Sequence, residues 1–223
     1  MPRNKVYAIV EGQGEANRPM PSEQPAVATL TLRLLQYFGC YDLFPAPRPW
    51  RLRSSGEFFR DNILERTLRA HTAFADCAGV LVLMDLEDDC PGLRGPELAE
   101  RIRNMGSTLP FSVAVTCAYR EYETWFLVSL DTIHPGESCP ENAESHRDAK
   151  GWLRERFGYR EVRDQARYTR SLDIEVTRQR SRSFQRLCHA FEELIAARAT
   201  SQPTVTPRPG AGALSVVSHE AYL

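Results

Sequence analysis

Three short, uninterrupted apolar runs constrain the fold of this chain more than any other feature. They are VYAIV at residues 6–10, VLVLM at 80–84 and FSVAVTCA at 111–118. Such runs, bounded by glycine or acidic residues, are typical of strands buried on both faces of a parallel sheet, where helices cover both sides. The sequence therefore predicts a parallel sheet that contains these three strands.

Helical patterns separate the apolar runs. Apolar residues recur at helical spacing over residues 25–38, 58–74 and 96–105. Residues 50–53 have the composition of a short edge strand. The alternation of strand and helix predicts an α/β fold, in which right-handed crossovers join the strands of a central parallel sheet flanked by helices.

The last third of the chain has a different pattern. We expect no strand after Gly151, whereas residues 184–195 repeat apolar side chains at helical spacing after a cap at Ser181 or Ser183. The stretch after Ala199 is rich in proline, glycine and small polar residues, which predicts a flexible tail. The expected units are an α/β domain, a helical appendage packed on it, and the tail, at residues 1–130, 131–199 and 200–223.

The composition excludes several classes of protein. With 223 residues, 42% of them hydrophobic, the chain can bury one substantial core. No apolar segment reaches the roughly 18 residues of a membrane span, so we expect a cytoplasmic protein without a membrane partner. The formal net charge of −1 provides no global attraction to nucleic acid. Six cysteines without a C-x-x-C pair predict reduced thiols rather than a zinc module or a disulfide framework.

Acidic residues follow each of the three predicted strands. Glu11 follows the first strand, Asp85 the second, and Glu121 and Glu123 come just after the third. Each acid alone is also explained by the need of a strand end to reach water. Because the carboxyl ends of parallel strands meet at the edge where ligands usually bind, we expect these acids to lie together. Three more acids crowd the end of the second strand, at Glu87, Asp88 and Asp89.

This density of like charge predicts a bound cation. Neighbouring carboxylates raise each other's pKa unless a cation neutralises them, and hard oxygen donors favour Mg²⁺ or Mn²⁺ over zinc. Magnesium usually takes one or two carboxylates and completes its shell with water and substrate phosphate, so a phosphate-bearing substrate is expected. Gly12 and Gly14 would let the backbone approach such a ligand closely. The chain lacks a G-x-x-x-x-G-K-[ST] loop, which argues against an ATPase.

Four spaced motifs resemble those of a known family. They are VEGQGE at 10–15, VLVLMDLEDDCP at 80–91, REYETWFL at 120–127 and RSRSFQRL at 180–187. Together they resemble a bacterial TOPRIM-like family still described as a domain of unknown function. That family is related to nucleases of the OLD (overcoming lysogenisation defect) type and is often found beside ATPases in anti-phage loci. The resemblance implies a TOPRIM/Rossmann-like central sheet.

The resemblance also implies roles for individual residues. Glu11 falls on the TOPRIM glutamate, which acts as a general base or a metal ligand. Asp85 and Glu87 fall on the two acids of the DxD motif, which holds Mg²⁺. Glu87 stands where aspartate is usual, so either its longer side chain binds with a different reach or Asp88 or Asp89 replaces it. The number of bound metals stays open for this reason.

The EYETW element supplies the last predicted ligand. Residues i and i+2 point the same way on a strand or in a loop but not on a helix, and we favour Glu121 over Glu123. Glu11 and Asp85 are the predicted catalytic residues. The full set of predicted metal ligands is Glu11, Asp85, Glu87, Asp88, Asp89 and Glu121.

Residues 147–186 form a positively charged segment. They contain eleven arginines and one lysine against six acids, with tryptophan, phenylalanine and tyrosine interleaved. This pattern fits arginines that contact phosphates beside rings that stack on bases, and it equally fits a solvated helical face whose rings point to the core. The predicted phosphate or nucleic-acid contacts are Gly12, Gly14, Lys150, Arg178, Arg180 and Arg182.

Two functions from different classes follow from these patterns. The first is a Mg²⁺-dependent TOPRIM-like nuclease that hydrolyses nucleic-acid phosphodiesters, DNA in preference to RNA, in an anti-phage system with an ABC- or SMC-like ATPase partner. The second is a non-catalytic regulatory subunit that docks on such an ATPase. A third option, phosphoryl transfer on a small molecule, would need a phosphate-binding loop, and the sequence offers only the Gly12 and Gly14 turn.

Overall fold

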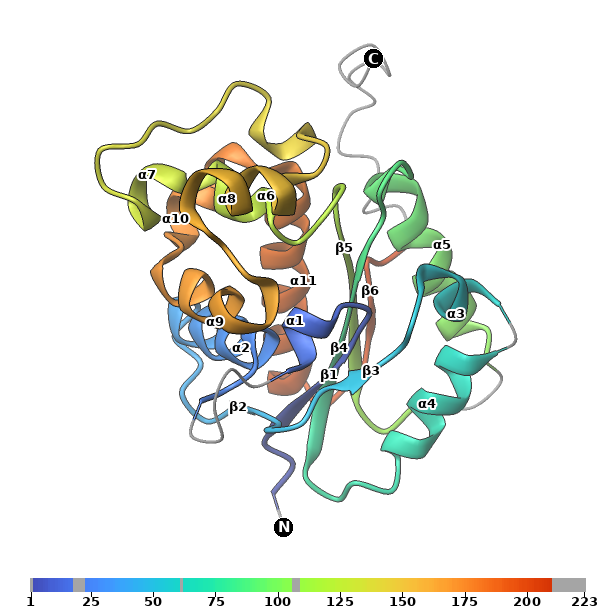
Figure 1. Cartoon of the computed structure of the whole chain (residues 1–223). Coiled ribbons are helices and arrows are strands. Elements are labelled where there is room, and N and C mark those ends of the chain that lie inside the picture. The colour runs from blue at the N-terminus through green and yellow to red at the C-terminus, as the bar shows by residue number, and fades with distance from the viewer. Residues whose placement is uncertain (1, 18–22, 61, 106–108, 210–223) are drawn as a thin grey trace.

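The centre of the molecule is a sheet of parallel strands (Figure 1). The computed structural model describes residues 2–17, 23–60, 62–105 and 109–209. Within these ranges the sheet has six strands in the order β2-β1-β4-β5-β6, with β3 also paired to β1, and every pairing is parallel. The three long strands, which correspond to the predicted apolar runs, are β1 (Lys5–Val10), β4 (Cys77–Asp85) and β5 (Ser112–Ala118). The short ones are β2 (Phe44–Pro45), β3 (Trp50–Arg51) and β6 (Val205–Thr206).

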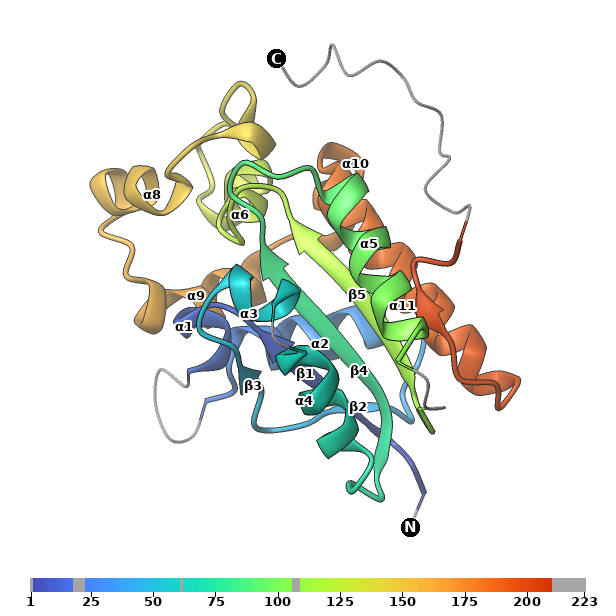
Figure 2. The same cartoon turned by 90° about the vertical axis from the view of Figure 1, so that its right-hand side faces the viewer.

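Helices cover both faces of this sheet, which confirms the predicted α/β class (Figures 1 and 2). One face carries α3 (Ser55–Phe59), α4 (Ile63–His71) and α5 (Pro91–Arg103). The other carries α1 (Gln13–Ala16), α2 (Ala26–Tyr37), α9 (Glu161–Ser171) and α11 (Arg182–Ala199). Five short elements lie near the carboxyl end of β5 on this second side: α6 (Thr124–Val128), α7 (Leu130–Ile133), η1 (Ala143–Ser145), α8 (Ala149–Phe157) and α10 (Ile174–Arg180).

The alternation of side chains along the strands produces two hydrophobic cores. Val6 and Val10 of β1 enter the core shared with α2 and α11, whereas Ile9 enters the core shared with α4 and α5. Each long strand therefore contributes side chains to both cores. The sheet packed between them fixes the position of the residues that follow each strand.

Two predicted helices have different bounds in the structure. The helix expected over residues 58–74 is two helices, α3 and α4, and Asn62 between them has a φ of 52° that a continuous α-helix cannot contain. The helix expected over 96–105 begins earlier, at Pro91, because proline suits the first turn, where its missing N–H costs nothing.

The C-terminal third packs against the sheet and shares its hydrophobic core. Ser181 is the N-cap of α11, and its hydroxyl accepts the Phe184 N–H at 3.0 Å. Phe184 and Phe191 are fully buried in the same core as Val6 and Val10, so the predicted separate appendage is not confirmed. The expectation of no strand after Gly151 is wrong, because β6 pairs with β5. Residues 210–223 of the expected tail lie outside the described residues.

All six cysteines are free thiols, as their spacing predicted. Burial raises the pKa of Cys77, Cys117 and Cys188 to about 12, so these three thiols stay protonated at neutral pH. Among the described helices, none has both the length and the apolar composition that crossing a bilayer requires.

Candidate active site

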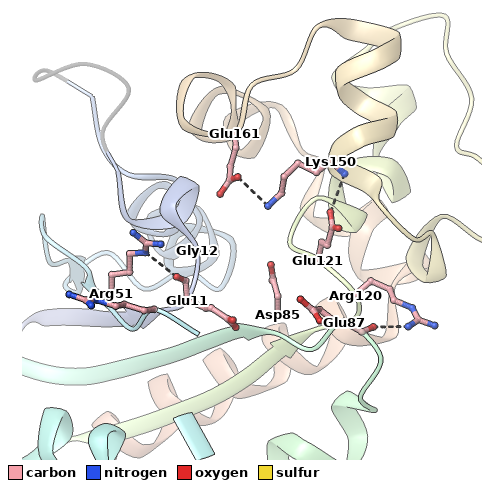
Figure 3. Close-up of a pocket in the computed structure, with 10 residues that line it drawn as sticks. Glu11, Gly12, Arg51, Asp85, Glu87, Arg120, Glu121, Lys150 and Glu161 are labelled. Atoms are coloured by element: carbon pink, nitrogen blue, oxygen red, sulfur yellow. Dashed lines mark hydrogen bonds and ion pairs between the residues drawn. The ribbon is translucent and has the colours of Figure 1, made fainter. Parts of the chain in front are cut away.

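A pocket of about 360 Å³ opens at the carboxyl ends of β1, β4 and β5 (Figure 3). Because the three strands are parallel neighbours, with Val10 opposite Leu83 and Asp85 opposite Ala118, the residues after them emerge at one edge. The acidic residues that line the pocket are Glu11, Asp85, Glu87, Glu121 and Glu161. The other lining residues are Gly12, Arg51, Arg53, Arg120 and Lys150.

The structure brings four of the six predicted metal ligands to this pocket. Glu11, Asp85, Glu87 and Glu121 surround one hollow, with Asp85 near its centre (Figure 3). Glu121 accepts the backbone N–H of Lys150 at 3.1 Å, which ties the turn after β5 to the start of α8. Lys150, predicted as a phosphate contact, also lines the pocket.

The other two predicted ligands, Asp88 and Asp89, lie outside the pocket lining. Both side chains are exposed. Asp88 forms ion pairs with Arg120 and Arg147, the latter at 2.7 Å, and these arginines lower the pKa of its carboxyl. Asp89 forms an ion pair with Arg94 at 2.9 Å. The crowded acids after β4 are therefore divided between the pocket and neighbouring arginines.

Glu87 occupies a strained turn at the edge of the pocket. Its φ of 49° lies in the left-handed region, which non-glycine residues seldom adopt. The turn is fixed by two contacts with Arg120: the Glu87 N–H donates to the Arg120 carbonyl at 3.0 Å, and Arg120 Nη1 donates to the Glu87 carbonyl at 2.7 Å. The position that differs from the DxD pattern thus also has an unusual backbone conformation.

Two further carboxyl groups lie buried close to the pocket. Glu15 of α1 is 3% exposed and Glu123 is fully buried. Gln165 Nε2 of α9 donates to Glu15 Oε1 at 2.9 Å and lies 3.4 Å from Glu123 Oε1, which also accepts the Tyr159 hydroxyl at 2.9 Å. Gln165 and Tyr159 were not predicted, because one glutamine and one tyrosine in an arginine-rich segment give no recognisable signal.

Gly12, a predicted ligand contact, lines the pocket and also lies against the buried Glu15 carboxyl group. A Cβ added at Gly12 would lie 1.7 Å from Glu15 Oε2, so any other residue there would displace this carboxyl group. Gly14, the other predicted glycine, lies within α1. The short EGQGE segment therefore places Glu11 at the pocket and Glu15 beneath Gly12.

The electrostatics of the site are those of a carboxylate cluster with too little positive charge. Burial, together with repulsion from Glu15 and Glu123, raises the pKa of Asp85 well above its usual range. Burial also raises the pKa of Glu15 and, opposed by Lys150, raises that of Glu123 to about 8. Burial lowers the pKa of Lys150, but nearby acids, including Glu123, reverse this effect and raise it overall.

Lys150 is the cation that reaches furthest into this cluster. Its Nζ lies 3.2 Å from Glu161 Oε2 and 4.0 Å from Glu123 Oε2 (Figure 3 shows the contact with Glu161). Glu161, which lines the pocket from α9, was not among the predicted site residues. Helices α8 and α9, which belong to the arginine-rich segment, thus form one wall of the pocket through Lys150 and Glu161.

The donor set fits Mg²⁺ or Mn²⁺ as a partly protein-bound ion. Within the described residues, no three His, Cys, Asp or Glu side chains converge closely enough to hold a metal alone. Magnesium needs only one or two carboxylates when water and phosphate supply the rest of its shell. The acidic residues of the pocket offer carboxylate oxygens, the hard donors that Mg²⁺ and Mn²⁺ prefer. The buried Glu15 Oε2 and Glu123 Oε2 have no hydrogen-bond partner in the described structure. Burial is the main cause of the raised pKa values of Glu15, Asp85 and Glu123, and a cation at the pocket would offset the repulsion that adds to it.

The three predicted nucleic-acid arginines do not line this pocket. Arg178 forms an ion pair with Glu192 at 3.0 Å, and Arg180 with Asp131 at 3.0 Å. Arg180 and Arg182 line a second pocket.

Comparisons with family models, with curated proteins and with solved structures found no match to this chain. The assignment of a reaction therefore depends on the chemistry of the site, with the sequence motifs as the other support.

Proposed function

We propose that this protein is a Mg²⁺-dependent TOPRIM-like nuclease that hydrolyses nucleic-acid phosphodiesters, with DNA as the preferred substrate. One observation supports it most: Glu11, Asp85 and Glu121, which follow three different strands, line a single pocket. Arg51, Arg53, Arg120 and Lys150 line the same pocket, so it presents both metal-binding oxygens and phosphate-binding cations.

Each group in the pocket has a role in this reaction. Glu11 and Asp85 would hold the ion, with Glu121 and Glu87 at its periphery. When bound, Mg²⁺ supplies an activated water and neutralises charge on the leaving oxygen. Glu11 also accepts the proton that the attacking water loses.

The cations position the substrate. Arg51 Nε donates to the Glu11 carbonyl at 3.2 Å, which holds the Arg51 guanidinium group beside the backbone of the catalytic acid (Figure 3). Arg53 and Lys150 extend the positive charge around the hollow, where phosphate oxygens would accept their hydrogen bonds.

The proposal is tested by incubating the purified protein with plasmid and single-stranded DNA and RNA, with and without Mg²⁺ or Mn²⁺. We expect metal-dependent cleavage that Asp85→Asn abolishes. Asp89→Asn is the matched control, because Asp89 is an exposed acid four residues away that pairs with Arg94. Cleavage that survives in Asp85→Asn would rule out this site.

The context of the reaction is the second part of the proposal. The motifs that resemble the TOPRIM-like family support a role in anti-phage defence beside an ABC- or SMC-like ATPase. Repeating the cleavage assay with the protein encoded by an adjacent ATPase gene tests this partner, and stimulation of cleavage is the expected result.

A regulatory subunit is the second candidate, and one observation favours it. No three metal-binding side chains among the described residues are preassembled around a common point. If the protein is such a subunit, calorimetry will show tight association with the ATPase and no Mg²⁺ or Mn²⁺ binding at millimolar concentration. Metal binding that depends on Asp85 favours the nuclease.

A further inference from the structure

A second pocket, also of about 360 Å³, adjoins the proposed active site. Its lining residues include Tyr119, Val128, Pro140 and Asn142, the acidic Glu144, and two arginines, Arg180 and Arg182. This mixture of apolar surface and guanidinium groups is the kind that receives a base or sugar next to a phosphate.

One contact joins the two pockets. Tyr119 lines the second pocket and its neighbour Arg120 lines the first. The Arg120 guanidinium lies over the Tyr119 ring, 4.8 Å from its centroid, and Arg120 Nη2 lies 3.2 Å from the Tyr119 hydroxyl. The turn after β5 therefore forms a wall that the two pockets share, and the Arg120 side chain in it is 14% exposed.

A second arginine extends this wall. Arg147, whose side chain is 71% exposed, shares the carboxylate of Asp88 with Arg120. Two guanidinium groups that converge on one anionic group form a geometry that a phosphate can also occupy. Asp88, with a side chain 69% exposed, is the anion held there in the described structure.

We propose that the substrate is a polynucleotide whose sugar–phosphate backbone continues from the first pocket, across Arg120 and Arg147, into the second pocket beside Arg182. This inference rests on the proposed phosphodiesterase activity and adds to it a binding path for the substrate outside the first pocket, with the arginines that contact the chain there. Along this path four arginines, with Arg180 the fourth, face three carboxylates, those of Asp88, Asp131 and Glu144. Asp88 competes with substrate phosphate for the two guanidinium groups.

The arginine variants test the path through binding and hydrolysis measured separately. Binding is followed by fluorescence anisotropy of labelled single-stranded oligodeoxynucleotides and oligoribonucleotides over a range of salt concentrations. Hydrolysis is followed with bis(4-nitrophenyl) phosphate, a diester small enough to need only the first pocket. Arg147→Ala and Arg182→Ala are compared with Arg66→Ala, a variant of an exposed arginine on α4 that lines neither pocket.

We expect Arg147→Ala and Arg182→Ala to weaken oligonucleotide binding several-fold and each to lower the salt dependence by about one counterion. Neither should change hydrolysis of the small diester, and Arg66→Ala should change neither property. Asp88→Asn should tighten oligonucleotide binding, because it removes the competing charge. The oligonucleotide that binds more tightly identifies the preferred sugar, deoxyribose or ribose.

Two results separate this inference from the function on which it rests. If the small diester is hydrolysed but both arginine variants bind oligonucleotides as the wild type does, the extended path is wrong and the proposed activity stands. If no diester is hydrolysed but binding depends on Arg147 and Arg182, the surface is a nucleic-acid site and the catalytic proposal fails. Weakened binding in Asp88→Asn also contradicts the path, because it would indicate a ligand role for Asp88.

Discussion

The acids at the sheet edge and the arginines of the last third are two clusters of like charge with opposite outcomes. Glu11, Asp85 and Glu121 are far apart in sequence and meet in one pocket. The arginines are close in sequence and disperse into separate ion pairs: Arg156 with Glu137, Arg163 and Arg167 with Asp164, Arg170 with Glu23, Arg178 with Glu192 and Arg180 with Asp131.

The difference shows that the topology of the sheet predicts a site better than the density of charge along the sequence does. A parallel sheet delivers the residues after its strands to one edge whatever lies between them, so strand-end acids converge. Charge density along helices constrains nothing of this kind, because successive turns point in different directions and exposed arginines pair with whatever acid is nearest. The following predictions test whether the two clusters also differ in energetics and function.

After the loss of cleavage expected for Asp85→Asn, the next largest effect is expected at Glu11, which is proposed to accept a proton. Glu11→Gln keeps the shape of the side chain but cannot accept the proton, and the single-turnover rate of DNA cleavage should fall about 10²- to 10⁴-fold. Glu155→Gln, an exposed glutamate on α8, is the control and should cleave normally. A loss below tenfold at Glu11 would mean that another group accepts the proton.

Removing the cation from the acidic cluster should destabilise the fold. Above about pH 8, where Glu123 is ionised, Lys150→Met leaves this buried carboxylate without its ion-pair partner. Breaking a buried pair costs about 3 kcal/mol of unfolding free energy, so the comparison is made at that pH. The chain has one other lysine, Lys5, whose ion pair with Asp76 is more exposed, so Lys5→Met should cost below about 1 kcal/mol. Urea unfolding of both variants measures the difference. Equal losses would show that the cluster is not specially dependent on Lys150.

The acidic cluster should also make stability depend on pH. The pKa of Glu123 is raised to about 8 in the folded state, so the folded protein holds this proton more tightly than the unfolded chain does. The resulting stabilisation is complete below about pH 4 and is lost as the pH rises toward 8. We expect Glu123→Gln to flatten this part of the stability curve, measured by urea unfolding across the range. An unchanged slope would place the titrating group elsewhere.

The smallest effect is expected among the dispersed arginines. Arg178 pairs with Glu192 and lies over the Phe38 ring, away from both pockets. Arg178→Ala should lower stability by about 0.5 kcal/mol and leave DNA affinity unchanged. A several-fold loss of affinity in the anisotropy assay would show that charge density alone had identified a nucleic-acid contact.

The same contrast explains which features were predictable from the sequence. The three long strands follow from local apolar runs, and their parallel order places Glu11, Asp85, Glu87 and Glu121 at one edge. The division of the acids after β4 was not predictable, because the two arginines that pair with Asp88, Arg120 and Arg147, come from segments distant in sequence.

The buried side of the site depends on long-range packing in the same way. Gln165 contacts Glu15 across 150 residues of sequence, a contact that no local pattern encodes. Strand β6 has only two residues, and its pairing with β5 comes from packing rather than from composition. Tertiary contacts therefore decided the features that sequence patterns missed.

The most direct test of the account is the position of a bound ion. Crystals of the protein soaked in Mn²⁺ should give an anomalous difference peak in the first pocket, within bonding distance of Glu11 or Asp85 carboxylate oxygens, and the peak should disappear in Asp85→Asn. The absence of a peak at millimolar Mn²⁺, or a peak confined to the exposed acids Asp88 and Asp89, would contradict the claim that the strand-end carboxylates share a divalent cation.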